Sequence, residues 1–342
     1  MIYSVGCLCF QIVLYTVAIV EYYFPSKPHK NDSVLSRSTP YARSFYFLLK
    51  ICRTLMGNML EMLIDFIPDS RMTQGPYDKS YTYHNIQVNN SGLDSVLVKS
   101  NTYNLEDNVF VIHFFGGGFL FGSPQMSLAS ISAMLKPLKA NCLSVSYGCA
   151  QNFTLQQMVD HAEQALEWVK SKGVKSNKIV LFGESAGCVL ATMLALRGHQ
   201  VACMVFSSPM TDLTRTGQSY ENEYNADADF LITVNGLKLA HDNLKRRNII
   251  QDMKDHSLVQ LSKKQLEKLK APIYVFWSPL EIFYTDIVKF VSNLRQANVV
   301  VYEEGDKPST WHCYTMYHRV IPEAKATFSN IIKFVYNNTR HK

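Results

Sequence analysis

Apolar positions along the chain fall into two recurring patterns, which are short continuous runs and longer stretches with an apolar residue every three or four positions. Continuous runs are typical of strands buried on both faces, whereas the wider spacing is typical of amphipathic helices. From about residue 80 onwards the two patterns alternate, which predicts a mostly parallel sheet with helices on both faces. The expected strands are 81–88, 95–99, 109–115, 142–147, 178–182, 201–206, 273–277 and 299–303, and the expected helices are 155–169, 186–196, 282–294 and 324–336.

Two regions depart from this alternation and predict the domain boundaries. Residues from about 210 to 270 are polar and helix-forming, which indicates an insertion over the sheet, and residues 24–42 have the Pro, Ser and charge content of a linker. An apolar repeat interrupted by charges at 43–65 predicts an amphipathic helix packed on the body, with a membrane-surface helix as the alternative. We therefore expect a terminal segment at 1–23, a linker and helix at 24–75, and a globular domain at 76–342.

The first twenty residues carry no charged side chain. Twenty helical residues have the length of a membrane span of roughly 30 Å. The segment predicts a hydrophobic anchor helix, with a cleaved signal peptide as the alternative. Lys27, Lys30 and Arg37 follow it and favour a cytosolic body, whereas four Asn-x-Ser/Thr triplets favour a lumenal one. The side of the membrane therefore stays open.

Composition and charge indicate an ordinary globular protein. The 342 residues are 47% hydrophobic and 18% charged, which excludes disorder, and the formal net charge of +6 is dispersed along the chain. The densest internal basic cluster, at 245–247, is expected to be a solvated helix face, so nucleic acid is not an expected partner. The eight cysteines form no C-x-x-C pair, so the sequence indicates no metal site.

The strongest chemical signal is the pentapeptide GESAG at 183–187, which matches G-x-S-x-G between an expected strand and an expected helix. In this context the serine occupies a sharp turn that exposes its hydroxyl, and the flanking glycines allow neighbouring chain to approach closely. The N-terminus of the following helix favours negative charge that develops beside the serine. Ser185 is therefore the expected nucleophile, and an ordinary turn that happens to contain serine is the alternative.

Three consecutive glycines at 116–118 follow another expected strand, about 70 residues before Ser185. Acyl transfer to a serine places negative charge on the carbonyl oxygen of the substrate. That oxygen needs backbone N–H donors about 3 Å away and an approach free of side chains. We expect Gly116, Gly117 and Ala186, the residue after the nucleophile, to supply these donors. A glycine turn without function is the alternative.

These stretches resemble the hormone-sensitive-lipase-like α/β-hydrolases, a family that includes arylacetamide deacetylases and fungal steryl acetyl hydrolases. The resemblance runs from about residue 80 to the C-terminus and includes SSPMTDL at 207–213, which is similar to the family's S-P-W-x-D-L. It implies an α/β-hydrolase fold with a helical cap built from the N-terminal helix and the 210–270 insertion. It also implies ester hydrolysis through an acyl-enzyme, with no metal or organic cofactor.

The resemblance further implies a base and an acid that follow the serine in the chain order Ser, acid, His. His312, just after the last expected strand, lies where the family's histidine falls, and His318 is its competitor. When the family's D-P-L-x-D-[DE] is aligned from Pro272, Glu281 takes the position of the catalytic acid and Asp286 takes the last position. Glutamate serves in some triads of this fold, so Glu281 is expected and Asp286 is the alternative.

Three positions depart from the family pattern. Phe115 replaces the histidine before the glycines, Glu281 replaces an aspartate and Cys188 replaces a glycine. The family's histidine holds the oxyanion loop through side-chain hydrogen bonds that Phe115 cannot make, although His113 lies on the same face of the expected strand. Because backbone donors survive these changes, a slower enzyme is a milder inference than an inactive one. The plant gibberellin receptors are a precedent in this family for ligand binding without turnover.

We expect a serine carboxylesterase or deacetylase that acts on a small hydrophobic ester, with sterol and lipid acetyl esters favoured by the resemblance. In this scheme Ser185 attacks, His312 takes the proton and returns it, and Glu281 orients His312. The alternatives are a catalytically impaired hydrolase-fold protein that binds a small hydrophobic ligand, and a membrane-tethered structural protein, which would not explain the nucleophile turn. The N-terminal segment implies a membrane partner and favours the endoplasmic reticulum membrane, with secretion as the alternative.

Overall fold

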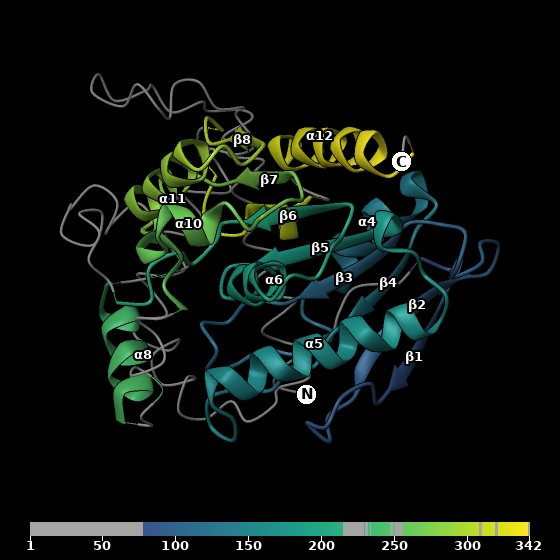
Figure 1. Cartoon of the computed structure of the whole chain (residues 1–342), viewed down its shortest axis with the longest axis horizontal. Helices are drawn as coiled ribbons and strands as arrows, with labels where there is room; N and C mark the ends of the chain where they lie inside the picture. Colours follow the sequence, from purple (N-terminus) through teal and green to yellow (C-terminus); the bar gives the residue numbers. More distant parts are fainter. Residues whose placement is uncertain are drawn as a thin grey trace, which may run out of the picture.

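A single eight-stranded sheet forms the centre of the protein (Figure 1). The computed structural model describes residues 78–214, 229, 232, 234–246, 249, 256–307, 310–318 and 321–340. The strands lie in the order β1-β2-β4-β3-β5-β6-β7-β8. Their bounds are β1 (Tyr81–Ile86), β2 (Ser95–Ser100), β3 (Phe110–Phe114), β4 (Asn141–Ser144), β5 (Ile179–Glu184), β6 (Cys203–Ser207), β7 (Ile273–Phe276) and β8 (Val301–Glu304).

The strand directions confirm the predicted mostly parallel sheet. The β1–β2 and β2–β4 pairs are antiparallel, and all other neighbours are parallel. In a parallel arrangement the carboxyl ends of successive strands meet at one edge, where ligands bind in open α/β sheets. The turns after β3, β5, β6 and β7 therefore share that edge of the sheet.

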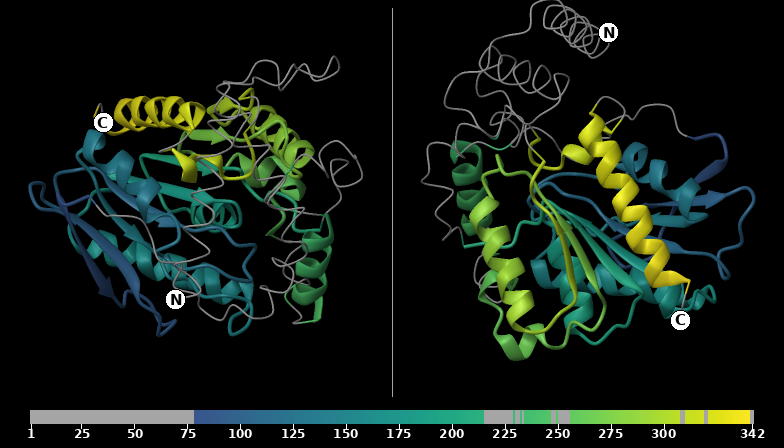
Figure 2. Two further views of the ribbon diagram at one scale, coloured as in Figure 1. Left: turned by 180° about the vertical axis from the view of Figure 1, so that it is seen from behind. Right: turned by 90° about the horizontal axis from the view of Figure 1, so that it is seen from above.

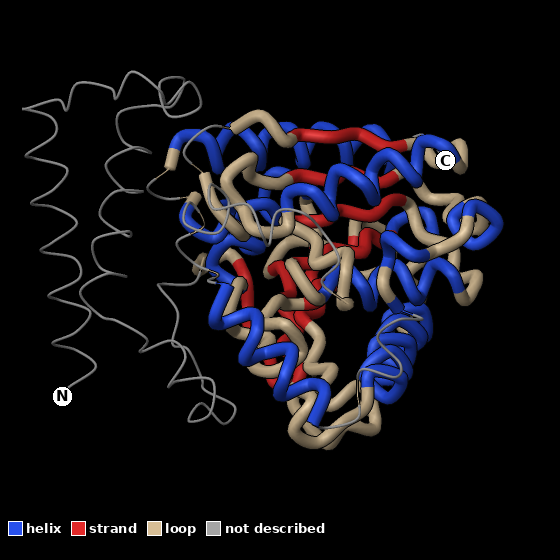
Figure 3. Tube along the Cα trace, turned by 90° about the vertical axis from the view of Figure 1, so that its left-hand side faces the viewer, coloured by secondary structure: helices blue, strands red, loops and turns tan. Residues whose placement is uncertain are grey.

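Helices cover both faces of the sheet (Figures 2 and 3). One apolar cluster joins the sheet to α5, α6 and α11, and a second joins its other face to α4 and α12. The helices are α4 (Leu128–Leu138), α5 (Leu155–Ser171), α6 (Gly187–Leu196), α8 (Val234–Arg246), α10 (Lys263–Leu266), α11 (Tyr284–Gln296) and α12 (Pro322–Thr339), with short 3-10 turns η2 (Ser176–Lys178), η4 (Leu258–Gln260) and η5 (Tyr314–Tyr317).

The two clusters explain the continuous apolar runs of the sequence. In β3, Phe110, Ile112 and Phe114 belong to the first cluster, whereas Val111 belongs to the second. Successive residues of a strand point to opposite faces, and both faces here are covered, so every position is apolar or internally paired. The remaining residue of β3, His113, is fully buried and becomes part of a polar network described below.

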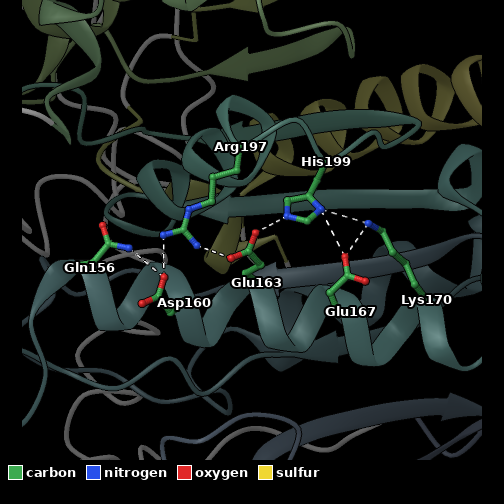
Figure 4. A network of polar contacts seen from close by, with 7 residues as sticks. All are labelled: Gln156, Asp160, Glu163, Glu167, Lys170, Arg197 and His199. Atoms are coloured by element: carbon green, nitrogen blue, oxygen red, sulfur yellow. Dashed lines mark hydrogen bonds and ion pairs between the residues drawn. The ribbon is translucent and has the colours of Figure 1, made fainter.

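Charged side chains join α5 to the turn that follows α6 (Figure 4). Arg197 bonds Asp160 at 2.7 Å and also bonds Glu163. His199 Nε2 contacts the other oxygen of Glu163, and His199 Nδ1 lies 3.4 Å from Glu167. These side chains lie on the outer side of the molecule, so we assign the network to stability and not to chemistry.

The two described ends of the segment between β6 and β7 are bonded to each other at one stem. Asp212 Oδ1 accepts hydrogen bonds from the Thr214 N–H and the Ser257 hydroxyl, both at 2.9 Å. The Val259 N–H donates to the Thr211 carbonyl at 3.1 Å. The described part of the segment between these ends includes α8, whose apolar side chains join the first cluster. The predicted insertion limits of about 210 and 270 stay a prediction.

The predicted anchor at 1–23 and the linker and helix predicted at 24–75 lie outside the described residues, which begin at residue 78. Within the described part of the chain, no helix combines the length and apolar character needed to cross a membrane.

Candidate active site

Ser185 lies on the turn between β5 and α6, where the sequence predicts a nucleophile. Its φ of 50° falls in the left-handed region, which is strained for serine and is a property of nucleophile turns in this fold. The turn is held by backbone bonds to the loop after β6. The Ser185 N–H donates to the Ser207 carbonyl at 2.9 Å, and the Ser185 carbonyl accepts from the Met210 N–H at 3.1 Å.

The two glycines of the pentapeptide are required by close chain approach. A Cβ at Gly183 would lie 2.6 Å from Cys188 Cα, and a Cβ at Gly187 would lie 2.1 Å from the Phe114 carbonyl oxygen. Both distances are too short for real atoms, so a side chain at either position would displace the nucleophile turn. Cys188 itself is buried in α6, with its sulfur 3.8 Å from the Ser207 carbonyl.

The glycine triplet passes directly against the nucleophile. A Cβ at Gly116 would lie 3.1 Å from Ser185 Cβ. Gly117 has a φ of 114°, and a Cβ there would lie 2.0 Å from the Phe121 carbonyl oxygen. Within the described residues, no backbone carbonyl outside the helices and strands accepts a bond from Gly116, Gly117 or Ala186 N–H. The geometry suits donors that are free to bind a developing oxyanion.

At the position where the family has a histidine, Phe115 stacks on another aromatic ring. Its ring lies 4.3 Å from that of Tyr147 at an interplanar angle of 19°, and the Tyr147 hydroxyl donates to the Phe115 carbonyl at 2.8 Å. Burial raises the pKa of Tyr147 well above its usual value, so the phenol remains a donor. A Cβ at Gly122 would lie 2.7 Å from the Phe115 ring, which shows how closely the loop wraps this side chain. The loop is therefore held by stacking and by one phenolic hydrogen bond.

The side chain of His113 contacts groups that hold the far end of the same loop, and not the glycine triplet. Its Nδ1 lies 2.8 Å from Ser144 Oγ, and that hydroxyl donates to the Pro124 carbonyl at 2.7 Å, so His113 Nδ1 carries the proton. His113 Nε2 lies 3.4 Å from Glu184 Oε2, which also accepts from the Ser127 hydroxyl. This buried network joins the residue before the nucleophile to the loop that follows the glycines.

The structure brings Glu281 and His312 into direct contact. His312 Nδ1 lies 2.8 Å from Glu281 Oε2, and both side chains are buried. The second oxygen of Glu281 accepts from the Ser278 N–H at 2.8 Å, while the Ser278 hydroxyl donates to the Thr310 carbonyl at 2.8 Å. Ser278 therefore fixes the acid and also joins the acid loop to the histidine loop.

The alternative candidates for the acid and the base, Asp286 and His318, lie in other parts of the fold. Asp286 lies in the first turn of α11, and the imidazole contact is made by Glu281. His318 follows η5 and packs its ring against Phe328 at 5.3 Å.

The loop after β6 links the nucleophile to the histidine. Ser208 follows Ser207, and its Oγ accepts a hydrogen bond from the Cys313 N–H of the histidine loop at 2.9 Å. Cys313 is the residue after His312 and has a φ of 54°, which turns the chain sharply there. Residues 207–210 thus hold Ser185 on one side and the His312 loop on the other.

The buried pair shifts the ionisation of the imidazole. Burial acts to lower the pKa of His312, but the neighbouring Cys313 and Glu281 outweigh it, and the pKa lies well above its usual value. The direction follows from the Glu281 carboxylate, because the pKa of the Cys313 thiol is itself raised by burial. The positive form of the imidazole, which arises when it takes a proton from the nucleophile, is therefore stabilised.

Sequence reasoning missed three residues of this site, which are Tyr147, Ser208 and Ser278. Each lies within a few residues of the carboxyl end of a strand, and Ser208 also lies in the SSPMTDL stretch at 207–213 that resembles a family motif. Among the described residues, no group of three His, Cys, Asp or Glu side chains is placed to hold a metal ion.

Comparison with known proteins identifies the family. A family model described as the alpha/beta hydrolase fold matches residues 111–316. The match covers more than half of the chain, and the chain belongs to this family.

Individual relatives are distant. An esterase from Acinetobacter venetianus is 24% identical over 229 residues, which are 66% of this chain and 73% of the relative. A carboxylesterase/phospholipase from Mycobacterium tuberculosis is 23% identical over 233 residues, which are 67% of this chain and 62% of the relative. The crystal structure of a hormone-sensitive lipase from a metagenome library has a TM-score of 0.70 at 21% identity, covering 87% of this chain and 98% of that one. The structural likeness confirms the fold.

Proposed function

We propose that the protein hydrolyses carboxylic esters through an acyl-enzyme on Ser185. One observation carries the proposal: the glycine loop lies against Ser185 on its strained turn, and the loop at 207–210 joins that turn to the loop of the Glu281–His312 pair. The relatives named as esterases support the same reaction class.

The geometry assigns a role to each group in the reaction. The proton on His312 Nδ1 is donated in a hydrogen bond to the Glu281 carboxylate, so Nε2 is the free base. During attack on the ester carbonyl carbon, Nε2 takes the Ser185 hydroxyl proton. Backbone N–H groups of Gly116, Gly117 and Ala186 bind the oxyanion. His312 then gives the proton to the leaving alcohol, and the acyl group stays on Ser185. In the second half, His312 takes a proton from water as the water attacks the acyl-enzyme. It then returns the proton to the Ser185 oxygen, and the acid is released.

The substrate we propose is a hydrophobic ester, with sterol or lipid acetyl esters as the favoured class. The support is the resemblance to deacetylases and the apolar character around the site, where Phe283 packs edge-on against His312 at 5.2 Å. Phe119, beyond the glycine triplet, is also buried. Such surroundings exclude water from the acyl group and favour an apolar alcohol.

Turnover of p-nitrophenyl esters from acetate to laurate tests the proposal. We expect the wild-type chain to release p-nitrophenol at a rate that depends on acyl length, and Ser185→Ala to fall to the background rate. Ser91→Ala, a serine in a surface turn after β1, is the matched control and should retain full rate. A well-folded wild type without turnover on any ester would contradict the proposal and favour the ligand-binding alternative.

We also propose that residues 1–23 tether the protein to the endoplasmic reticulum membrane, since the first twenty of them carry no charged side chain and are enough to span it as a helix. Alkaline carbonate extraction of membranes from expressing cells tests this. Retention in the pellet, lost when residues 1–23 are deleted, is the expected result. Release of the full chain into the supernatant would contradict the tether, and appearance in the medium would favour secretion.

A further inference from the structure

A carboxylate from the insertion reaches the loop of the candidate catalytic acid. Asp229 is fully buried, and its Oδ2 accepts a hydrogen bond from the Ile282 N–H at 3.1 Å. Its Oδ1 accepts from the Ile232 N–H, also at 3.1 Å. Ile282 directly follows Glu281 in the chain. One side chain therefore joins the backbone of the insertion to the backbone that carries the acid.

This contact is distinct from the stem of the insertion. The two ends of the insertion are held at Asp212, through Thr214 and Ser257. Asp229 is a further point of attachment, from the interior of the inserted segment, and its partner is the acid loop between β7 and α11. Two buried aspartates of one segment thus have different partners.

The environment of Asp229 is unfavourable for a carboxylate that serves packing alone. Burial raises its pKa to about 6, while the positive charge of His312 acts to lower it and the charge of Glu281 acts to raise it. The charged groups that act on Asp229 are therefore the two members of the candidate triad. An apolar or amide side chain would avoid the cost of burying the charge.

We propose that Asp229 is a positioning residue, which fixes the acid loop through the Ile282 N–H and thereby sets the orientation of Glu281 on His312. The proposal rests on the function proposed above. Asp229 makes no contact with the reacting atoms in this role, and it makes the geometry of the triad depend on the placement of the insertion.

The bonding pattern explains why aspartate and not asparagine stands here. Each carboxylate oxygen accepts one backbone N–H, from Ile232 on one side and Ile282 on the other. An asparagine at this position has one oxygen and one NH₂ group, so one of the two N–H donors would face another donor. Asp229→Asn therefore removes charge and one hydrogen bond while it preserves shape.

Steady-state kinetics on a p-nitrophenyl ester separate positioning from packing. For Asp229→Asn we expect kcat to fall roughly 5- to 50-fold, with KM changed by no more than about twofold, because the substitution acts on the orientation of Glu281 and not on a contact with the substrate. Asp212→Asn is the matched control, since it loosens the stem without touching that loop. It should lower the melting temperature and leave kcat within about twofold.

A double-mutant cycle tests the route of the effect. If Asp229 acts through Glu281, adding Asp229→Asn to Glu281→Gln should change kcat by less than about twofold. The proposal is overturned if the two losses multiply, if Asp212→Asn lowers kcat as much as Asp229→Asn does, or if Asp229→Asn has wild-type kcat. It is also overturned if Asp229→Asn cannot fold, which would mark Asp229 as a residue of stability alone.

A spectroscopic readout keeps this test separate from the function proposed above. In nitrogen-15 histidine-labelled protein, the titration of His312 should move to lower pH in Asp229→Asn, because a negative charge that stabilises the imidazolium has been removed, and it should not move in Asp212→Asn. Absence of ester turnover by wild type would refute the proposed function, whereas an unmoved His312 titration in Asp229→Asn would refute the role of Asp229.

Discussion

His312 and Glu281 lie 31 residues apart in the chain and meet in a buried hydrogen bond of 2.8 Å between Nδ1 and Oε2. The bond fixes the imidazole tautomer, so the proton stays on Nδ1 and Nε2 is left to act as a base. The extra methylene of glutamate is accommodated because the Ser278 N–H holds the other carboxylate oxygen. A glutamate can therefore orient the histidine where the wider family uses aspartate.

Replacing the acid by its amide should reverse that tautomer. In Glu281→Gln the Ser278 N–H can donate only to the amide oxygen, so the NH₂ group faces His312 Nδ1. Nδ1 must then accept a hydrogen bond, and the imidazole proton moves to Nε2. We expect kcat to fall by about 10²- to 10⁴-fold with the fold intact. Asp286→Asn, the corresponding change at the alternative acid, is the control. A larger loss in Asp286→Asn than in Glu281→Gln would show that the wrong carboxylate has been assigned.

The pH dependence of turnover should report His312. Its pKa lies above the usual value of about 6.5, and the base must be neutral to accept the serine proton. The kcat/KM profile should therefore rise with pH through a midpoint above 6.5 and reach its plateau only in mildly alkaline solution. A midpoint below 6.5, measured with a substrate that does not itself titrate, would contradict the assigned environment.

The pH dependence of stability should report Asp229. Its pKa is raised from 3.8 unfolded to about 6 in the folded protein, so the folded state holds the extra proton between these values and the free energy of unfolding falls as pH rises through them. Asp229→Asn has no such titration. Relative to wild type it should gain about 2–3 kcal/mol of unfolding free energy between pH 4 and pH 7, as measured by urea denaturation. A difference that does not change with pH would contradict an ionised, buried Asp229.

The aromatic support of the glycine loop should be measurable at Tyr147. In Tyr147→Phe the stack on Phe115 survives, but the Phe115 carbonyl loses its donor, at a cost of about 1–2 kcal/mol in unfolding free energy. A modest loss of kcat should accompany it as the loop relaxes. Tyr302→Phe removes a hydroxyl from a tyrosine that is 52% exposed and should change neither quantity. Equal effects of the two substitutions would refute a special role for the Tyr147 hydroxyl.

The charged network on the surface of α5 should add modestly to the free energy of unfolding, and only above acidic pH. Burial acts to raise the pKa of Glu163, but bonds and charge from His199 and Arg197 outweigh it, so the pKa lies below its usual value. Such a group stabilises the folded state above its unfolded pKa, and the contribution is lost as pH falls through the folded value. Glu163→Gln should therefore cost about 0.5–1 kcal/mol at neutral pH and nothing in strong acid, as followed by denaturant melts.

Local features of the site were predictable from the sequence because they arise over a few residues. The G-x-S-x-G turn and the glycine triplet are demanded by backbone geometry and close approach around Ser185, and both appear as sequence motifs. The apolar runs likewise predicted the positions of the strands along the chain, although not their order in the sheet. Helix α4 was not predicted, because LASISAMLKPL has serines among its apolar residues, a proline near its end and no clear polar face.

Features that depend on tertiary contact were not predictable in the same way. Choosing Glu281 over Asp286 rested on an alignment to the family, and it is the loop held by Ser278 that places the carboxylate on His312. Tyr147 supports Phe115 from another strand end, and Asp229 reaches the acid loop from 53 residues away. No local pattern marks such residues, since their partners are remote in the chain.

The most direct test of the proposed chemistry is covalent labelling of Ser185 by a fluorophosphonate, whose phosphorus is attacked by an activated serine with loss of fluoride. The intact mass of the labelled chain and peptide mapping would locate the adduct. We expect one adduct on Ser185 in wild type, none in Ser185→Ala, and greatly slowed labelling in His312→Ala and Glu281→Ala. A folded wild-type chain that stays unlabelled, or labelling at full rate without His312, would contradict a working triad.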